Sequence, residues 1–124
     1  MLTERFRKRQ AEIDIKKENA RATYPSLWRN LILEWQSAKL DAAWLTYAAN
    51  YLFFTAGLRW ALDPFSFLTR IGGEAQPDFA TDLKMLNLVV LSHAHSDHFD
   101  PILLKAIASL PLTWVIPDFM LDQV

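Results

Sequence analysis

"LNLVVLSHAHSDHFDPILLKAIASLPLTWVI", residues 86–116, shows the order of structural elements most clearly. Residues 86–91 are almost continuously aliphatic, as in a strand that is buried on both faces. Asp100 and Pro101 then form a typical helix start, a capping side chain followed by a first-turn proline. Residues 112–116 are rich in strand-forming side chains. The stretch predicts a strand, a loop, a helix and a second strand, parallel to the first and reached by a right-handed crossover.

All three histidines of the chain lie in the predicted loop, as His93, His95 and His98, with Asp97 among them. Active sites of α/β sheets collect at the carboxyl ends of strands, which is where this loop begins. In an extended segment His93 and His95 project to the same side and can bind one metal ion. Asp97 continues along that side, and the turn into the helix can redirect His98. Asp97 and His98 can therefore bind a second ion.

The alternative is a turn in which Asp97 or Asp100 caps the helix and the histidines are merely exposed. Three imidazoles and a carboxylate beside a buried strand would lose solvation and repel one another when protonated, unless a cation organised them. We therefore interpret the loop as half the ligand set of a two-metal site. Imidazole and carboxylate suit zinc, and also manganese or iron.

Composition limits the other possibilities. The 124 residues are 52% apolar and 22% charged, which is typical of one modest globular domain. There is no cysteine, so neither a disulfide nor a thiolate zinc site can form. The start, MLTERFRKRQ, is too charged for a signal peptide and favours a cytoplasmic protein.

Charge divides the chain into two parts. Residues 1–40 carry a net charge of +4 and residues 41–124 a net charge of −5. The basic cluster RFRKR, residues 5–9, could bind nucleic acid, but acidic residues are interleaved with it, which favours an ordinary solvated helix face. We expect two domains: a helical amino-terminal extension, 1–40, and a second unit, 41–124.

The extension is predicted to contain two helices. Residues 3–22 hold many good helix formers and no proline or glycine, and Pro25 is expected to end this helix. Ser26 can then cap a second helix with one wide apolar face, made of Leu27, Trp28, Leu31, Ile32 and Trp35.

Residues 42–58 carry no charge and reach the lower length limit for a membrane span. Their polar residues and the turn signal at Thr55, Ala56 and Gly57 instead favour a β-hairpin that ends at Asp63 and Pro64, with Arg59 on its open face. We therefore expect no transmembrane segment. A short helix is predicted around residues 79–84.

The run His93-Ala94-His95-Ser96-Asp97-His98 resembles the H-x-H-x-D-H motif of the metallo-β-lactamase-fold hydrolases, with a strand before it and a helix after it. The upstream stretch WLTYAANYLFFTAGLRWALDP resembles the opening hairpin of that superfamily, including its Asp-Pro. The branch with ascorbate-phosphate lactonases and N-acyl-phosphatidylethanolamine phospholipase D-like enzymes is the most similar. Lactonase-like relatives often have Gly-His where this chain has Thr46-Tyr47. The resemblance covers about residues 42–124.

This resemblance implies a fold of the α+β class. The chain would be the amino-terminal part of a four-layer αββα metallo-β-lactamase sandwich, preceded by a helical arm. It implies two divalent metal ions, most often zinc, with His93 and His95 on the first and Asp97 and His98 on the second. Asp97 would also act in catalysis by accepting a proton from the nucleophilic water. Asp63 would lie behind the metal ligands and orient one of them by a hydrogen bond; the alternative is a residue of an Asp-Pro turn.

The family's site also needs two further histidines and a bridging aspartate. No histidine follows His98, and the later carboxylates are Asp100, Asp118 and Asp122. We therefore expect these residues to be an amino-terminal fragment of a longer hydrolase, with weak metal binding and little turnover when isolated.

The predicted function is metal-dependent hydrolysis of an ester, lactone or phosphodiester by metal-activated water, with a small-molecule substrate. One alternative is a nucleic-acid-processing nuclease of the same superfamily, which the basic arm alone suggests. Another is a non-catalytic interaction module that binds a partner through an exposed sheet edge and the apolar helix face. The oligomeric state does not follow from the sequence.

Overall fold

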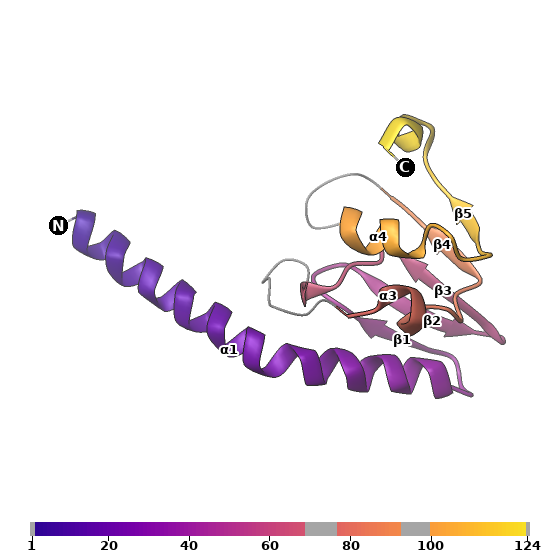
Figure 1. Ribbon diagram of the computed structural model, residues 1–124, viewed down its shortest axis with the longest axis horizontal. Helices are drawn as coiled ribbons and strands as arrows, with labels where there is room; N and C mark the ends of the chain where they lie inside the picture. The colour runs from indigo at the N-terminus through magenta and orange to yellow at the C-terminus, as the bar shows by residue number, and fades with distance from the viewer. Residues whose placement is uncertain (1, 69–76, 93–99, 124) are drawn as a thin grey trace.

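A computed structural model describes residues 2–68, 77–92 and 100–123. They form a five-stranded mixed sheet with helices gathered on one face, in agreement with the predicted α+β class (Figure 1). The strands follow one another across the sheet in chain order, β1 to β5. Within the described residues no helix is long and apolar enough to cross a lipid bilayer.

Helix α1 runs without interruption from Leu2 to Ser37, with Pro25 inside it. The predicted break at Pro25 and the cap at Ser26 are therefore wrong. A proline removes one backbone hydrogen bond and bends a helix, but packing on either side can keep the helix continuous. The ribbon changes direction where the outer half of α1 joins the half that lies against the sheet (Figure 1).

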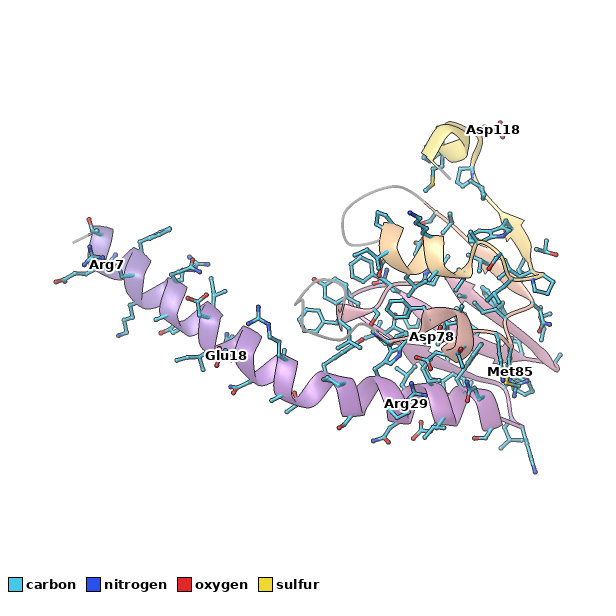
Figure 2. The ribbon with its side chains drawn as sticks, viewed as in Figure 1. Arg7, Glu18, Arg29, Asp78, Met85 and Asp118 are labelled. Carbon is cyan, nitrogen blue, oxygen red and sulfur yellow. The ribbon has the colours of Figure 1, made fainter. Side chains whose placement is uncertain are left out.

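The two halves of α1 have different surroundings. The outer half is exposed around its circumference and carries Arg7 and Glu18 away from the sheet (Figure 2). The inner half buries Trp28, Ile32 and Trp35 in the core. Three residues of the helix face that we considered as a partner surface are thus covered within the chain, and Leu27, at 59% exposure, points outward.

Strands β1 (Ala42–Leu45), β2 (Tyr51–Thr55) and β3 (Leu58–Leu62) form an antiparallel meander. The predicted turn at Ala56 and Gly57 is confirmed between β2 and β3, but the stretch before it, expected as one strand, forms β1, a loop and β2. The two turn residues both have positive φ, 49° at Ala56 and 83° at Gly57, as a two-residue turn that matches the strand twist requires.

The predicted strand, helix and strand of residues 86–116 are also confirmed. They are β4 (Leu88–Val90), α4 (Pro101–Ile107) and β5 (Thr113–Val115), and β4 is parallel to both β3 and β5. The short helix predicted near residue 79 is α3 (Phe79–Asp82), and the chain also contains a 3-10 helix, η1 (Asp118–Gln123).

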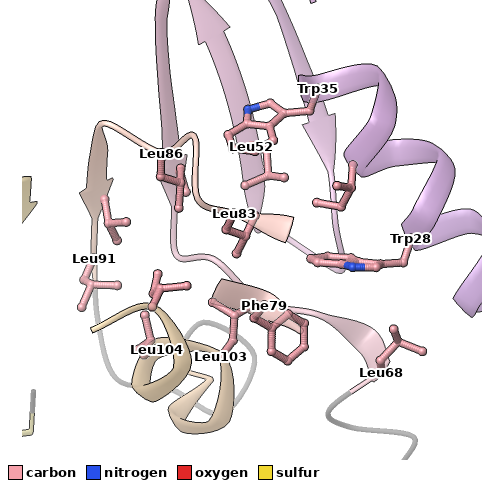
Figure 3. Close-up of a cluster of buried hydrophobic side chains, with 14 of the residues drawn as sticks. Trp28, Trp35, Leu52, Leu68, Phe79, Leu83, Leu86, Leu91, Leu103 and Leu104 are labelled. Atoms are coloured by element: carbon pink, nitrogen blue, oxygen red, sulfur yellow. The ribbon is translucent and has the colours of Figure 1, made fainter. Parts of the chain in front are cut away.

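The hydrophobic core lies between the helices and one face of the sheet (Figure 3). Leu52, Ala61 and Val89 are adjacent across β2, β3 and β4, and all three are buried. Side chains from α1, from α3 and from α4 pack on this row, among them Trp35, Phe79 and Leu103. One core therefore joins all three helices to the sheet.

The opposite face of the sheet is apolar and accessible to solvent. Strand alternation gives it twelve residues, of which none is charged and none is buried: Ala43, Leu45, Tyr51, Phe53, Thr55, Leu58, Trp60, Leu62, Leu88, Val90, Thr113 and Val115. We call this surface the open face. The prediction that β4 is buried on both sides is therefore wrong for the described structure, since only Val89 is buried.

Arg59 was expected on an open sheet face, but it lies on the helix-covered one. Its guanidinium donates hydrogen bonds to the backbone carbonyls of Trp35 (3.1 Å), Gln36 (2.9 Å) and Ala38 (3.0 Å), and lies over the Phe54 ring. These carbonyls lie at the carboxyl end of α1, where helical partners are lacking and a positive charge is favoured.

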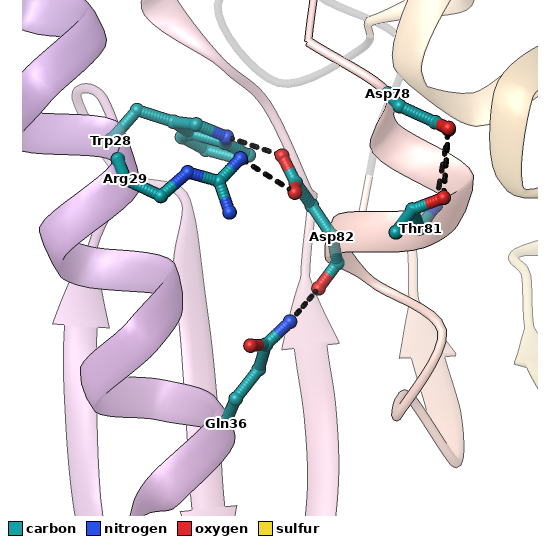
Figure 4. A network of polar contacts seen from close by, with 6 residues as sticks. All are labelled: Trp28, Arg29, Gln36, Asp78, Thr81 and Asp82. Carbon is teal, nitrogen blue, oxygen red and sulfur yellow. Dashed lines mark hydrogen bonds and ion pairs between the residues drawn. The ribbon is translucent and has the colours of Figure 1, made fainter.

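A buried carboxylate ties α1 to α3. Asp82 accepts hydrogen bonds from the Trp28 indole at 3.0 Å and the Arg29 guanidinium at 2.8 Å, and its backbone carbonyl accepts one from Gln36 (Figure 4). Asp78 caps α3 by accepting from the Thr81 hydroxyl and backbone N–H, which lower the pKa of the Asp78 carboxyl. Helix α3 is thus fixed to α1 by polar as well as apolar contacts.

We expect Arg59→Met to lower the free energy of unfolding by roughly 1–3 kcal/mol, because three buried or half-buried carbonyls lose a charged donor. Urea unfolding followed by circular dichroism measures this. Arg7→Met, on the outer half of α1, is the control and should change stability by less than about 0.5 kcal/mol. Equal stability of the two variants would contradict the capping role of Arg59.

Candidate functional site

The four predicted metal ligands, His93, His95, Asp97 and His98, lie outside the described residues, so the structure gives no geometry for them. It does describe the residues on either side. Ser92 lies two residues after the end of β4, and Asp100 directly precedes α4. The motif therefore connects the carboxyl end of a central strand to the start of a helix, as the sequence predicts.

The described residues on either side of the motif lie at one edge of the sheet. The parallel strands β3, β4 and β5 have adjacent carboxyl ends, at Leu62, Val90 and Val115. The loop between β1 and β2, residues 46–50, belongs to the same edge because Leu45 pairs with Tyr51, and Tyr51 with Leu62. Such edges are where α/β sheets place their functional loops.

Asp63 fixes the residue that precedes His93. It is 1% exposed and stands directly after β3. Its carboxylate accepts a hydrogen bond from the Ser92 backbone N–H at 2.7 Å and another from the Ser92 hydroxyl. Its own N–H donates to the Val90 carbonyl at 2.8 Å. Asp63 therefore joins the end of β3 to the end of β4 and to Ser92, two residues beyond it.

The two alternatives considered for Asp63 both find support in this geometry. Its φ of 46° is the left-handed conformation of a turn residue, which aspartate tolerates better than most side chains. Its carboxylate also points to Ser92 and holds the beginning of the motif. Whether it contacts a metal ligand stays a prediction, since those side chains lie outside the described residues.

Asp100 fixes the other end of the motif. It is 2% exposed and caps α4, as predicted, by accepting from the Leu103 backbone N–H at 3.1 Å. The second oxygen of its carboxylate accepts from the Ser66 backbone N–H, also at 3.1 Å. This second contact was not predicted, because nothing local in the sequence relates residue 66 to residue 100.

The described residues that flank the motif are thus bonded to one short segment, residues 63–66. Ser92 is held by Asp63 and Asp100 holds Ser66. A loop whose two ends are fixed has less conformational entropy, so ordering its side chains around a ligand costs less free energy. A metal site whose ligands lie on such a loop gains from this preorganisation.

Asn50 links the neighbouring loop to the same segment. This fully buried amide donates from Nδ2 to the Asp63 carbonyl at 2.9 Å, and its oxygen accepts from the backbone N–H groups of Ala48 and Ala49. The Thr46 N–H in turn donates to the Asn50 carbonyl at 2.8 Å. The sequence signal for Asn50 was its place as a polar residue in an uncharged stretch, but its partner is thirteen residues away.

Tyr24 brings α1 to the site. Its hydroxyl donates to the Thr46 carbonyl and accepts from the Phe67 backbone N–H at 3.3 Å. Burial raises the pKa of the Tyr24 phenol, and the hydrogen bonds from the Phe67 N–H and with Ser66 oppose this effect. The phenol is therefore a neutral link between the loop after β1 and the segment after β3. No sequence pattern predicted a role for this residue.

Three aromatic rings stack at this edge. The Tyr47 ring lies 4.9 Å from Phe65 at an interplanar angle of 17° and 5.2 Å from Phe67 at 14°, measured between ring centroids. Tyr24 contacts Phe67 edge to face at 5.2 Å. We call Tyr47, Phe65 and Phe67 the aromatic stack.

The described residues contain no group of three histidine, cysteine or acidic side chains placed to hold a metal ion. Asp63 and Asp100 are buried, and their carboxylates accept the hydrogen bonds described above. Comparison with protein-family models, with curated proteins and with solved structures found no match.

We expect Asp63→Asn to destabilise the fold by roughly 1–2 kcal/mol, because a buried charged acceptor of two hydrogen bonds is lost. Asparagine tolerates positive φ, so backbone strain does not enter the result. Urea unfolding measures the loss, and hydrogen exchange at the Ser92 amide locates it.

The matched control is Asp78→Asn. Asp78 likewise accepts from a backbone N–H and a hydroxyl, those of Thr81, but it is exposed, and asparagine caps helices as well as aspartate does. A stability loss in Asp63→Asn no larger than in Asp78→Asn would refute the anchoring role of the Asp63 carboxylate.

Proposed function

We propose that this chain carries one part of a binuclear metal site of a hydrolase that uses metal-activated water on an ester, lactone or phosphodiester. The observation that supports this most is the fixing of both ends of the H-x-H-x-D-H motif by the buried carboxylates Asp63 and Asp100. A solvated turn of exposed histidines has no need of two buried anchors.

The donor chemistry of the motif suits two divalent ions. His93 and His95 supply imidazoles for the first, and Asp97 and His98 supply a carboxylate and an imidazole for the second. Two donors for each ion are fewer than a closed four-coordinate zinc site requires. Further donors must complete the set, so this stretch alone is expected to bind metal weakly and to turn over little or no substrate.

The proposed chemistry divides between the metals and the chain. Bound metal ions would lower the pKa of water and stabilise negative charge on the attacked oxygen. Asp97 would accept the proton of that water. Asp63 would position the motif through Ser92, which is a positioning role, and a buried anchor of this kind is what metal ligands commonly depend on.

The proposal also includes a fold: the sheet described here would be one layer of a four-layer αββα sandwich. The described structure has helices on one face of a sheet, while the other face is apolar and uncharged. A second sheet packed on the open face would bury its nine large apolar or aromatic side chains. This surface supports the sandwich because isolated sheets with one bare apolar face are not stable arrangements in water.

Zinc binding at the motif can be measured by NMR. All three histidines of the chain lie in this loop, so their imidazole signals report on it alone. We expect added zinc to shift all three imidazoles, and Asp63→Asn to weaken this binding by about 10- to 100-fold. Asp78→Asn should leave the zinc affinity unchanged. Imidazole signals that stay in place with excess zinc would refute the metal site. Tight binding of two ions with turnover would contradict the incomplete ligand set.

A second candidate function is binding of a partner chain, and the open face favours it. Contiguous apolar surface of this kind on a soluble domain usually marks an interaction site. This function does not involve the motif, so it should survive removal of metal, whereas metal-dependent hydrolysis should not.

We expect the chain to self-associate at micromolar concentration through the open face, equally with and without EDTA. Light scattering coupled to size-exclusion chromatography measures this. Leu45→Lys should weaken the association, because it places a charge on the open face. Leu33→Lys is the matched control: Leu33 is 51% exposed on α1, and Leu45 is 50% exposed on β1. Equal effects of both variants, or none from either, would exclude the open face as the contact.

A further inference from the structure

The outer half of α1 has one apolar side. Phe6 and Ile13 are two helical turns apart, so their side chains lie in line along the helix. Phe6 is 70% exposed and Ile13 is 39% exposed. We call these two residues the outer stripe. Three turns beyond Ile13, on the same side of α1, Tyr24 is buried and its hydroxyl donates to the Thr46 carbonyl. The apolar side of α1 therefore continues past the sheet, where the described residues leave it exposed.

Basic side chains border the outer stripe. Arg9 is one turn from both Phe6 and Ile13, and Lys16 is one turn beyond Ile13. On the other border, Gln10 donates a hydrogen bond to Asp14 at 3.1 Å. The acidic residues of the outer half all lie at least about 100° around the helix from Ile13: Glu4, Glu12, Asp14 and Glu18. The surface next to the outer stripe is therefore cationic and suits an anionic partner.

The shape of the molecule limits what this partner can be. The sheet lies on the side of α1 that carries Tyr24, which is also the side of the outer stripe. A flat lipid bilayer that touched the outer stripe would overlap the sheet. The outer half itself extends past the edge of the sheet, which leaves room for a narrow element alongside it (Figure 1). A helix is narrow enough to lie there.

Chemistry limits the partner further. Nucleic acid offers phosphates to the cations, but its backbone gives an exposed phenylalanine and isoleucine no apolar contact. The outer half of a second copy has the same cations beside its stripe, so Arg9 and Lys16 would meet like charges. A protein segment that carries both apolar and acidic side chains satisfies both parts of this surface.

We propose that the outer stripe binds an acidic amphipathic helix of a partner protein. Apolar side chains of that helix contact Phe6 and Ile13, and its carboxylates pair with Arg9 and Lys16. A helix laid along α1 presents side chains at the same two-turn interval as the outer stripe, so one alignment serves both contacts. This surface does not include the histidine motif, and the proposal does not depend on the hydrolase function.

A synthetic helix can serve as the probe. We expect a labelled peptide of three LEELAEE repeats to bind the whole chain at least about tenfold more tightly than a peptide of three LKKLAKK repeats, because only the first has carboxylates for the basic border. Fluorescence anisotropy measures both dissociation constants. Raising the salt concentration to about 0.5 M should weaken binding of the acidic peptide. Equal affinities for the two peptides, or no binding of the acidic one, would overturn the proposal.

Ile13→Asn and Ile15→Asn form a matched pair with the same composition and net charge. Ile15 is 61% exposed and lies on the opposite side of α1 from Ile13. We expect Ile13→Asn to weaken binding of the acidic peptide about fivefold or more and Ile15→Asn to weaken it less than about twofold. Circular dichroism checks that both variants keep their helix content. An effect of Ile15→Asn as large as that of Ile13→Asn would refute the outer stripe as the contact.

Arg9→Gln and Arg7→Gln test the basic border in the same way. Arg7 extends away from the sheet and lies about 120° around the helix from Ile13 (Figure 2). Only Arg9→Gln should weaken binding of the acidic peptide and reduce its dependence on salt. Binding of a short DNA duplex or of vesicles that contain phosphatidylserine, more tightly than the acidic peptide and lost in Ile13→Asn, would overturn the proposal in favour of nucleic acid or membrane.

Discussion

Two buried carboxylates, Asp63 and Asp100, hold the beginning and the end of the histidine loop, and the rest of the site depends on this constraint. Burying a carboxylate is costly unless hydrogen bonds compensate for the lost water. Asp63 accepts from the N–H and the hydroxyl of Ser92, and Asp100 accepts from the Leu103 N–H and from the Ser66 N–H in a different segment of the chain. These hydrogen bonds compensate for the lost solvation. They also fix the ends of β3 and β4 and the start of α4 relative to one another.

Helix α1 contributes to the same constraint from outside the sheet. Arg59 binds the carbonyls at its carboxyl end, Asp82 binds Trp28 and Arg29 in its middle, and Tyr24 reaches the loops at the site. These contacts are spread along the inner half of the helix. The extension expected at residues 1–40 is therefore not uniform: its inner half shares the core of the sheet, and its outer half is exposed.

Local chemistry was predictable from the sequence, and contacts between distant segments were not. The cap at Asp100 and the turn at Ala56 and Gly57 follow from preferences of neighbouring residues, and both are confirmed. The break expected at Pro25 failed because tertiary packing can outweigh the loss of one helical hydrogen bond. The positions of Tyr24, Asn50 and the second Asp100 contact depend on the register of the sheet, which no local pattern specifies.

The open face connects the fold to the proposed function. Strand β4 is aliphatic at every position, a pattern that evolves under burial on both sides, yet only Val89 is buried by the described residues. A bare apolar patch of about 400 Å² corresponds to roughly 10 kcal/mol of transfer free energy, which is comparable with the stability of a whole small domain. Such a surface favours a covering layer. The second sheet of the proposed sandwich would provide that layer and would be the source of the further donors that the proposed metal site needs.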